Sequence, residues 1–397
     1  MSSAPTLEEL APAGHDPARD PYPVYAALRA RGPVHCVLVP GSGESWLVVS
    51  RDAARQALTD PRLSNDIRHS ATWDTDGGHA LGRNMLQSDP PHHTRLRGLV
   101  AGHFTPGRIA ALRPRVEALA DALLADLPEQ GTVDAVHRYA LPLPVAVICE
   151  LLGVPEGGRD AFHAWSRELV MPTSEAAATA AGAQLAGLIG DLVARKAADP
   201  DGTLLAELPV AGQDGGLAAD ELIGMVFLLL VAGHETTVHL ISATLFGLLT
   251  HPDQLAMVRA DPSLTAAAVE ETLRHRAPVH STAFRFASEP LELAGTSIAA
   301  GDAVLVSLAA ASRDPAHYSD PDRFDLRRTG PAHIAFGHGL HHCLGAPLAR
   351  MEAETALRRF LARCPEVAFA TDPATLTWRS STLLRGLTDL PLRLGRR

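Results

Sequence analysis

The sequence FGHGLHHC, residues Phe336 to Cys343, places three histidines and one cysteine within eight residues. Imidazole and thiolate groups are common metal ligands, so the stretch indicates a metal site. A structural zinc site usually takes its four ligands from two separated pairs, and no second pair lies near this stretch. A site with one protein ligand and a histidine-rich surface loop without metal remain as alternatives.

The residues around the cysteine favour a single ligand. Glycines at 337, 339 and 345 allow turns and close backbone approach. The sequence LGAPLARMEAETALRRFLA then predicts a helix from about residue 344 to 362. A thiolate at a helix N-terminus is stabilised by the dipole and by free N–H groups, which lower its pKa. Such a loop presents one sulfur to a flat ligand, as a haem iron with one axial thiolate requires.

Length and composition describe a globular protein of 397 residues, with 46% hydrophobic and 20% charged residues. A net charge of −10 without a long basic run argues against nucleic acid as a partner. Four cysteines without a CxxC pair suit a reducing compartment. The N-terminus shows no signal peptide, and the most apolar segment, residues 222–233, is too short to span a bilayer. We therefore expect a cytoplasmic protein without membrane association.

Periodicity predicts mostly helix, from about residue 91 to 276 and from 344 to 362, with β-rich portions at about 34–50, 281–310 and 366–393. The longest helix is expected to begin after Asp220 as N-cap and to end near Thr250, a length of roughly 45 Å. No internal repeat or long linker divides the chain. We expect one domain, residues 1–397, that is mainly α with a smaller antiparallel β subdomain.

Three further motifs could serve a bound cofactor. AGHETT, residues 232–237, is expected to interrupt the long helix, because Thr236 can bond back to the carbonyl four residues earlier. A Glu-Thr pair beside a haem could relay protons to bound oxygen, although a polar patch on a buried helix is the alternative. His93 and Arg97 share a helical face and could clamp a carboxylate, or form a solvated basic surface. Glu271 and Arg274 are three apart, which alone predicts an ordinary exposed pair.

The loop sequence resembles a known family. Phe336, Gly337, Gly339, His341, Cys343 and Gly345 match the F-G-x-G-x-H-x-C-x-G signature of the cytochrome P-450 monooxygenases. The resemblance covers essentially the whole chain, and it is greatest to soluble bacterial members that hydroxylate macrolides and other large secondary metabolites. It implies the cytochrome P-450 fold, with haem b between the long central helix and the helix after the cysteine loop.

The resemblance also implies a role for each matched residue. Cys343 is the expected axial iron ligand, and Glu235 and Thr236 are the expected catalytic proton relay. His338 and His342 fall at variable positions and are expected to be solvated loop residues. Propionate contacts are expected from His93, Arg97, Arg285 and His341. Other haem contacts are expected from Ala232, Gly233, Phe336, Gly337 and Gly345. A buried structural triad that supports the cysteine loop is expected from Glu271, Arg274 and Arg323.

The implied reaction uses dioxygen, two electrons and a hydrophobic small molecule, in a monomer. No reductase domain is visible, so a separate ferredoxin and ferredoxin reductase are expected partners. Candidate docking residues for an acidic ferredoxin are Arg95, Arg108 and Arg350. The segments 64–88 and 170–181 are expected to be mobile pocket covers. Expected substrate contacts, each of which could instead belong to the core, are Leu86, Leu228, Val231, Ala232, Val279, Ser281 and Leu383.

Other activities remain open at this stage. The substrate could be a polyketide or macrolide, a terpenoid or a steroid, and the reaction could be hydroxylation or epoxidation. A haem-thiolate peroxygenase, isomerase or dehydratase would need no relay of protons to dioxygen, so the Glu235–Thr236 pair disfavours it. A non-catalytic haem or zinc protein is the third possibility.

Overall fold

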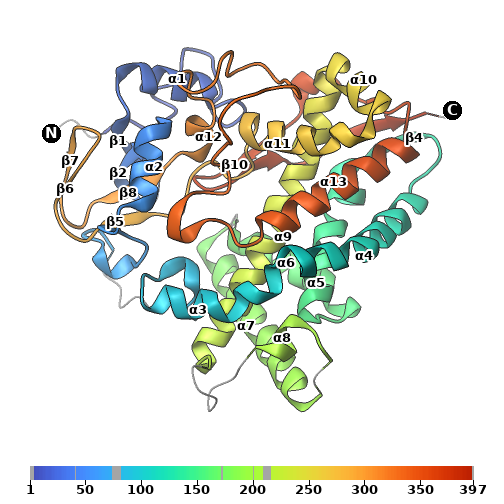
Figure 1. Ribbon diagram of the computed structural model, residues 1–397, viewed down its shortest axis with the longest axis horizontal. Coiled ribbons are helices and arrows are strands. Elements are labelled where there is room, and N and C mark those ends of the chain that lie inside the picture. The colour runs from blue at the N-terminus through green and yellow to red at the C-terminus, as the bar shows by residue number, and fades with distance from the viewer. Residues whose placement is uncertain are drawn as a thin grey trace.

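Helices form most of the molecule, and small sheets lie mainly at one side, as Figure 1 shows for this computed structural model. The structure describes residues 4–40, 42–73, 82–170, 173–199, 201–208 and 216–395. The mainly α class with a smaller β part is confirmed.

The central element is α9, Ala219–Thr250, which spans 32 residues or about 48 Å. Every residue from Val238 to Leu248 is buried, because α5 (Pro142–Leu152), α11 (Thr265–His275) and α13 (Ala346–Arg363) pack around this helix. Two expectations about α9 were wrong. The N-cap is Ala218, whose N–H donates to the Glu221 carboxylate at 2.9 Å, and Asp220 lies inside the first turn. The helix also continues unbroken through residues 232–237.

Shorter helices surround this core. The cysteine-loop helix, expected from 344 to 362, begins two residues later than predicted because Gly345 is its N-cap. The remaining α-helices are α1 (Tyr22–Arg31), α2 (Arg51–Thr59), α3 (His92–Ala101), α4 (Pro106–Ala125), α6 (Arg159–Val170), α7 (Glu175–Ala198), α8 (Leu204–Glu207), α10 (Pro252–Ala260) and α12 (Leu308–Ala311).

The largest sheet has the strand order β1-β2-β8-β5-β3. Its strands are β1 (Val34–Val39), β2 (Gly43–Val48), β3 (Leu63–Ser64), β5 (Arg285–Ala287) and β8 (Ala303–Val306). The β2–β8 pair is parallel, while the other pairs in this sheet are antiparallel. It follows that the sheet joins the N-terminal strands to the segment after α11.

Three smaller antiparallel sheets complete the β part. They are formed by β4 (Gly131–Asp134), β12 (Pro391–Leu394) and β9 (Ala368–Phe369), by β10 (Trp378–Ser380) and β11 (Arg385–Leu387), and by β6 (Leu291–Leu293) and β7 (Thr296–Ile298). The sequence predicted the regions that hold most strands but not β3 and β4, because two and four residues are too few to show an alternating pattern.

Two helices are long and apolar enough to cross a membrane by length and composition alone. They are α7, whose apolar window is 28% buried, and α9, whose window is 61% buried. The burial of α9 at the centre of the helical core explains its apolar character without a membrane.

Candidate active site

The loop before α13 holds Cys343 in a defined turn. The Cys343 N–H donates to the Phe336 carbonyl at 2.9 Å, and Gly337 and Gly339 have φ angles of +75° and +73°. A Cβ on Gly339 would lie 2.8 Å from the Leu58 carbonyl oxygen, so a larger residue there would displace the loop from α2. These two glycines therefore fix the position of the cysteine.

The N-terminus of α13 donates to the thiol as the sequence predicted, but the pKa of Cys343 is raised and not lowered, because burial outweighs these donors. Burial raises the pKa of the Cys343 thiol, while backbone N–H groups of Gly345 and Ala346 and the charge of Arg97 act in the opposite direction. Cys343 is partly exposed, and its sulfur is supplied with hydrogen-bond donors, which suits a single metal-bound thiolate.

Four nitrogen-bearing side chains lie beside this loop. The rings of His93 and His341 are 4.4 Å apart, and Arg285 and Arg97 both act electrostatically on His341. Within the described part of the chain, both ring nitrogens of His93, Nε2 of His341 and Nε of Arg285 are buried without a hydrogen-bond partner. Burial lowers the pKa of His341 to about 3 and that of Arg285 to about 10. Arg97 donates to the His342 carbonyl at 2.7 Å.

These orphaned donors fit a ligand that carries carboxylates. Unpaired buried polar groups are costly, and a carboxylate would accept from several of them at once. Cys343 lies close enough to Arg97 for the two to interact electrostatically. One thiol and a cluster of nitrogen donors that could bind carboxylates lie in the same place, and they match the two ends of a haem, its iron and its propionates.

The zinc alternative does not match this geometry. Among the residues that the structure describes, no three His, Cys, Asp or Glu side chains are arranged to hold a metal ion. His342 is exposed and His338 is partly exposed. The four cysteines are all free.

On α9, Leu228, Ala232 and Thr236 lie at successive four-residue steps and therefore share one face. The Thr236 hydroxyl donates to the Ala232 carbonyl at 3.1 Å, as predicted. Gly233, an expected cofactor contact, lies against α5. A Cβ there would lie 2.8 Å from Ile148 Cδ1, so this glycine permits the close packing of α9 on α5.

The Glu235 carboxyl is buried between two histidines. Its oxygens lie 3.9 Å from His234 Nε2 and 3.7 Å from His239 Nε2. Burial raises the pKa of Glu235, while the charges of Arg379 and Arg167 act in the opposite direction. The i, i+4 spacing of Glu235 and His239 was visible in the sequence, whereas the approach of Arg379, from β10, was not.

The structural triad contains a different arginine from the one expected. Glu271 accepts from Arg274 at 2.8 Å through two bonds and from Arg328 Nε at 3.2 Å. The side chain of Arg323 is 64% exposed, and only its carbonyl joins the cluster, as acceptor for Arg274 and Arg328. The match to the P-D-R-F motif assigned the third position of the triad to Arg323. In the structure Arg328, five residues later, turns back to the Glu271 carboxylate instead. The cluster fixes the segment that leads to the cysteine loop.

We predict that Arg328→Met lowers the free energy of unfolding by about 3 kcal/mol, since it removes one partner of a buried ion pair. Arg323→Met is the matched control and should change stability by less than about 0.5 kcal/mol. Denaturant unfolding of both variants measures the difference. Equal effects of the two substitutions would show that Arg328 is not the third member of the cluster.

The expected substrate residues lie on several separate segments. Leu228, Val231 and Ala232 lie on α9, and two of the three exposed large hydrophobic residues in the described chain are the expected contacts Leu86 (37%) and Leu383 (39%). Val279 pairs with Leu384, which brings the segment after α11 beside the loop between β10 and β11. Ser281 is buried and its backbone forms a β-bridge with Ser307.

The two segments expected to cover the pocket, 64–88 and 170–181, are described in part. Residues 74–81 and 171–172 lie outside the described residues, and α7 occupies 175–181.

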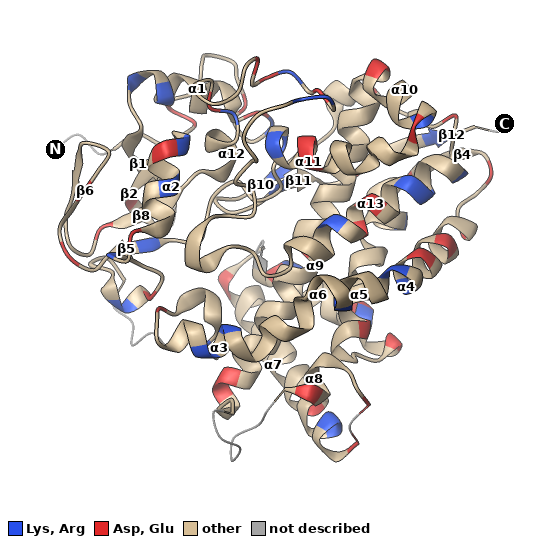
Figure 2. Ribbon diagram, viewed as in Figure 1, with Lys and Arg blue, Asp and Glu red and all other residues tan. Residues whose placement is uncertain are grey.

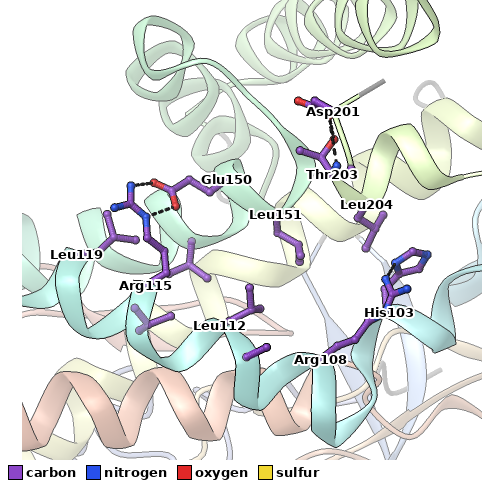
Figure 3. A pocket seen from close by; sticks show the side chains of 14 residues that line it. His103, Arg108, Leu112, Arg115, Leu119, Glu150, Leu151, Asp201, Thr203 and Leu204 are labelled. Atoms are coloured by element: carbon purple, nitrogen blue, oxygen red, sulfur yellow. Dashed lines mark hydrogen bonds and ion pairs between the residues drawn. The ribbon is translucent and has the colours of Figure 1, made fainter. Parts of the chain in front are cut away.

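The three expected docking arginines are all engaged in ion pairs. Arg95 binds Glu221, and Arg350 binds Glu270 at 2.6 Å while its guanidinium lies 4.5 Å from the Phe336 ring centroid. Arg108 binds Glu207 at 3.0 Å and lines a cavity of about 390 Å³ between α4, α5 and the start of α8 (Figure 3). Arg115 and Glu150 pair across the same cavity at 2.7 Å. Its charges are therefore satisfied internally.

Comparison with known proteins agrees with the site. A family model described as "Cytochrome P450" matches residues 201–372. The chain is 48% identical over 399 residues to the cytochrome P450 monooxygenase PikC of Streptomyces venezuelae, covering 100% of this chain and 96% of PikC. It is 44% identical over 390 residues to 6-deoxyerythronolide B hydroxylase of Saccharopolyspora erythraea, covering 94% and 96%.

A solved structure is similar over the same extent. The tirandamycin C-bound P450 monooxygenase TamI superposes with a TM-score of 0.90 at 43% identity, covering 96% of this chain and 99% of TamI. A single cysteine loop beside nitrogen donors for carboxylates is the arrangement of a haem-thiolate protein. The chain belongs to the cytochrome P450 family, and it is a monooxygenase of that family.

Proposed function

We propose that the protein hydroxylates or epoxidises a bulky hydrophobic small molecule of the polyketide or macrolide class, using dioxygen and two electrons from separate proteins. The observation that carries this proposal is Cys343 at the start of α13, beside the unpartnered buried nitrogens of His93, His341 and Arg285. We also propose that the protein is cytoplasmic and monomeric, and that it consists of one domain that binds haem b.

The chain's own residues have distinct tasks. Bound haem would supply an iron centre that binds and activates dioxygen. Cys343 would hold the iron through its sulfur, and His93, Arg97, Arg285 and His341 would bind the propionates. The Thr236 hydroxyl and the Glu235 carboxyl would hold and pass protons towards bound oxygen. The apolar face of α9 at Leu228 and Ala232 would position the substrate and keep water away.

The substrate class is supported by the names of the relatives and by the apolar candidates of the pocket. 6-Deoxyerythronolide B hydroxylase is named for a macrolide substrate, and TamI was solved with tirandamycin C. Leu86 and Leu383 leave apolar surface exposed on two different segments. A mostly apolar site with few polar anchors suits a large, sparsely functionalised ligand.

A spin-state titration of the purified holoenzyme against macrolides, other polyketides, terpenoids and steroids tests this proposal. We expect saturable low-to-high-spin conversion with a polyketide, and one oxygen atom from labelled dioxygen in the product. Conversion only with terpenoids or steroids would contradict the substrate class. Turnover without dioxygen and electron donors would favour the isomerase or peroxygenase alternative.

The docking surface for the electron donor is proposed from unpaired positive charge near the cysteine loop. Basic residues lie on α2, α3 and α13 (Figure 2). Arg55 on α2 is exposed, and its guanidinium has no ion pair within the described chain. The helix α2 contacts the loop that carries Leu340, which is 44% exposed. An acidic ferredoxin could therefore bind the Arg55 guanidinium and contact the apolar side chain of Leu340.

We predict that Arg55→Glu slows reduction by an acidic ferredoxin about tenfold at low salt, because rim charges act mainly on the association rate. Arg259, on α10, is also exposed, and Arg259→Glu is the control that should leave the rate unchanged. Stopped-flow reduction at several salt concentrations makes the measurement. Equal rates for Arg55→Glu and the parent protein would reject this docking surface.

A further inference from the structure

The tautomer of each histidine beside Glu235 is determined by its other contacts. His234 Nδ1 lies 2.8 Å from the Leu230 carbonyl oxygen, which can only accept, so Nδ1 carries the proton. Burial lowers the pKa of His234 to about 4, so the ring is neutral near pH 7 and its Nε2 has a lone pair. That lone pair is 3.9 Å from Glu235 Oε1. His234 is therefore an acceptor towards the carboxyl.

His239 has the opposite polarity. Within the described residues neither ring nitrogen of His239 has a hydrogen-bond partner, and a Cβ on Gly386 would lie 1.9 Å from Nδ1, so an N–H at Nδ1 would be directed at the Gly386 Cα–H group. Burial, followed by the charge of Arg379, lowers the pKa of His239 to about 4. A neutral ring with an unprotonated Nδ1 carries its proton on Nε2, 3.7 Å from Glu235 Oε2. His239 is therefore a donor towards the carboxyl.

The other groups that face this cluster allow His234 Nε2 to accept a proton from the Glu235 carboxyl. The Ser166 hydroxyl, on α6, lies 3.1 Å from His234 Nε2 and 3.0 Å from the His163 carbonyl, so it can turn its proton away from Nε2. Arg379 lies opposite Gly386 in the β10–β11 pair and interacts electrostatically with Glu235 and His239. Arg167 on α6 adds a second positive charge, and His163 acts on His234.

We propose that His234 and His239 are positioning residues that hold the Glu235 carboxyl between an acceptor and a donor, so that it keeps a partner in both protonation states. The neutral acid donates from Oε1 to His234 Nε2, and the carboxylate accepts at Oε2 from His239 Nε2–H. The two separations of 3.9 and 3.7 Å are longer than hydrogen bonds, so each bond of the proposal requires a shift of the side chains by about 1 Å. The inference rests on the proposed relay role of Glu235, which must lose and regain one proton in each cycle.

Opposite polarities give opposite effects on the Glu235 pKa. An acceptor stabilises the neutral acid, and a donor stabilises the carboxylate. Removing the acceptor from His234 should therefore lower the pKa of Glu235, and removing the donor from His239 should raise it. Burial raises the pKa of Glu235 in the parent protein, so its neutral form persists above the usual titration range of a glutamate. A merely structural role would give shifts of the same sign, because water entering either cavity would favour the carboxylate.

The test is an infrared pH titration of the neutral carboxyl band, in holoenzyme with labelled glutamate, taken as the difference from Glu235→Gln. His234→Asn keeps a donor for the Leu230 carbonyl but loses the acceptor, and we expect its midpoint about one unit lower, the equivalent of one hydrogen bond. His239→Leu should titrate about one unit higher. His239→Gln restores an N–H near the position of Nε2 and should titrate as the parent.

Shifts of equal sign in His234→Asn and His239→Leu, or no shift in either, would overturn the proposal. His239→Gln that behaves as His239→Leu would also count against it. Thermal unfolding of each variant confirms that the fold is kept. Full coupling of oxygen use to product in Glu235→Gln would instead refute the relay role, while opposite midpoint shifts would still support the positioning of the carboxyl.

Discussion

Cys343→Ala is expected to abolish turnover. The substitution removes the only sulfur in the loop before α13, and with it the proposed iron ligand and the acceptor of the Gly345 and Ala346 N–H groups. No neighbouring side chain can replace it in the same geometry, because the His341 ring packs against His93 and His342 is exposed. We expect a loss of at least about a thousandfold, which corresponds to about 4 kcal/mol of transition-state stabilisation.

Cys364→Ala is the matched control for that variant. Cys364 is also a free and buried cysteine, and it is the C-cap at the other end of the same helix. We expect turnover within about twofold of the parent, with at most a modest loss of stability from the small cavity. Product analysis under saturating electron donor compares the two variants. Comparable activity in Cys343→Ala and Cys364→Ala would show that Cys343 is not the ligand.

The second large effect is expected from Thr236→Ala. The hydroxyl of Thr236 lies on the same face of α9 as Leu228 and Ala232, next to the buried Glu235. Without it, protons would reach bound oxygen without control, so reduced oxygen would be released as peroxide. We expect the fraction of electrons recovered in product to fall about tenfold or more while oxygen consumption continues, because a positioned proton donor is lost.

Two further substitutions separate the relay from packing. Thr236→Ser keeps the hydroxyl and should retain most of the coupling. Thr237→Ala changes the next residue, which is buried on a different face of the same helix, and should leave coupling unchanged. Peroxide and product are measured together in each variant. Full coupling in Thr236→Ala would remove this residue from the relay.

Local patterns predicted the features that depend on a few neighbouring residues. The cysteine loop and the glycines around it were readable because one turn followed by one helix determines their geometry. The Thr236 hydroxyl bond to Ala232 was predictable for the same reason, since it follows from the helix repeat.

Features that depend on distant segments were not predictable. Arg328 rather than Arg323 reaches Glu271, because the backbone between them turns back on itself. The contact of Gly233 with Ile148 depends on where α5 crosses α9. His239 acquires its polarity from Gly386, which is 147 positions later in the chain. In each case the deciding neighbour is set by tertiary packing and not by local spacing.

The carbon monoxide difference spectrum of the freshly purified, reduced protein tests the central claim most directly. The spectrum reports the atom that binds the iron from the protein side. It therefore separates the Cys343 sulfur from the nitrogen of His341, its rival in the same loop. We predict a thiolate-type band in the parent protein, and its loss in Cys343→Ala. An imidazole-type band in the parent, or a thiolate-type band that survives in Cys343→Ala, would contradict the assignment of Cys343 as the axial ligand.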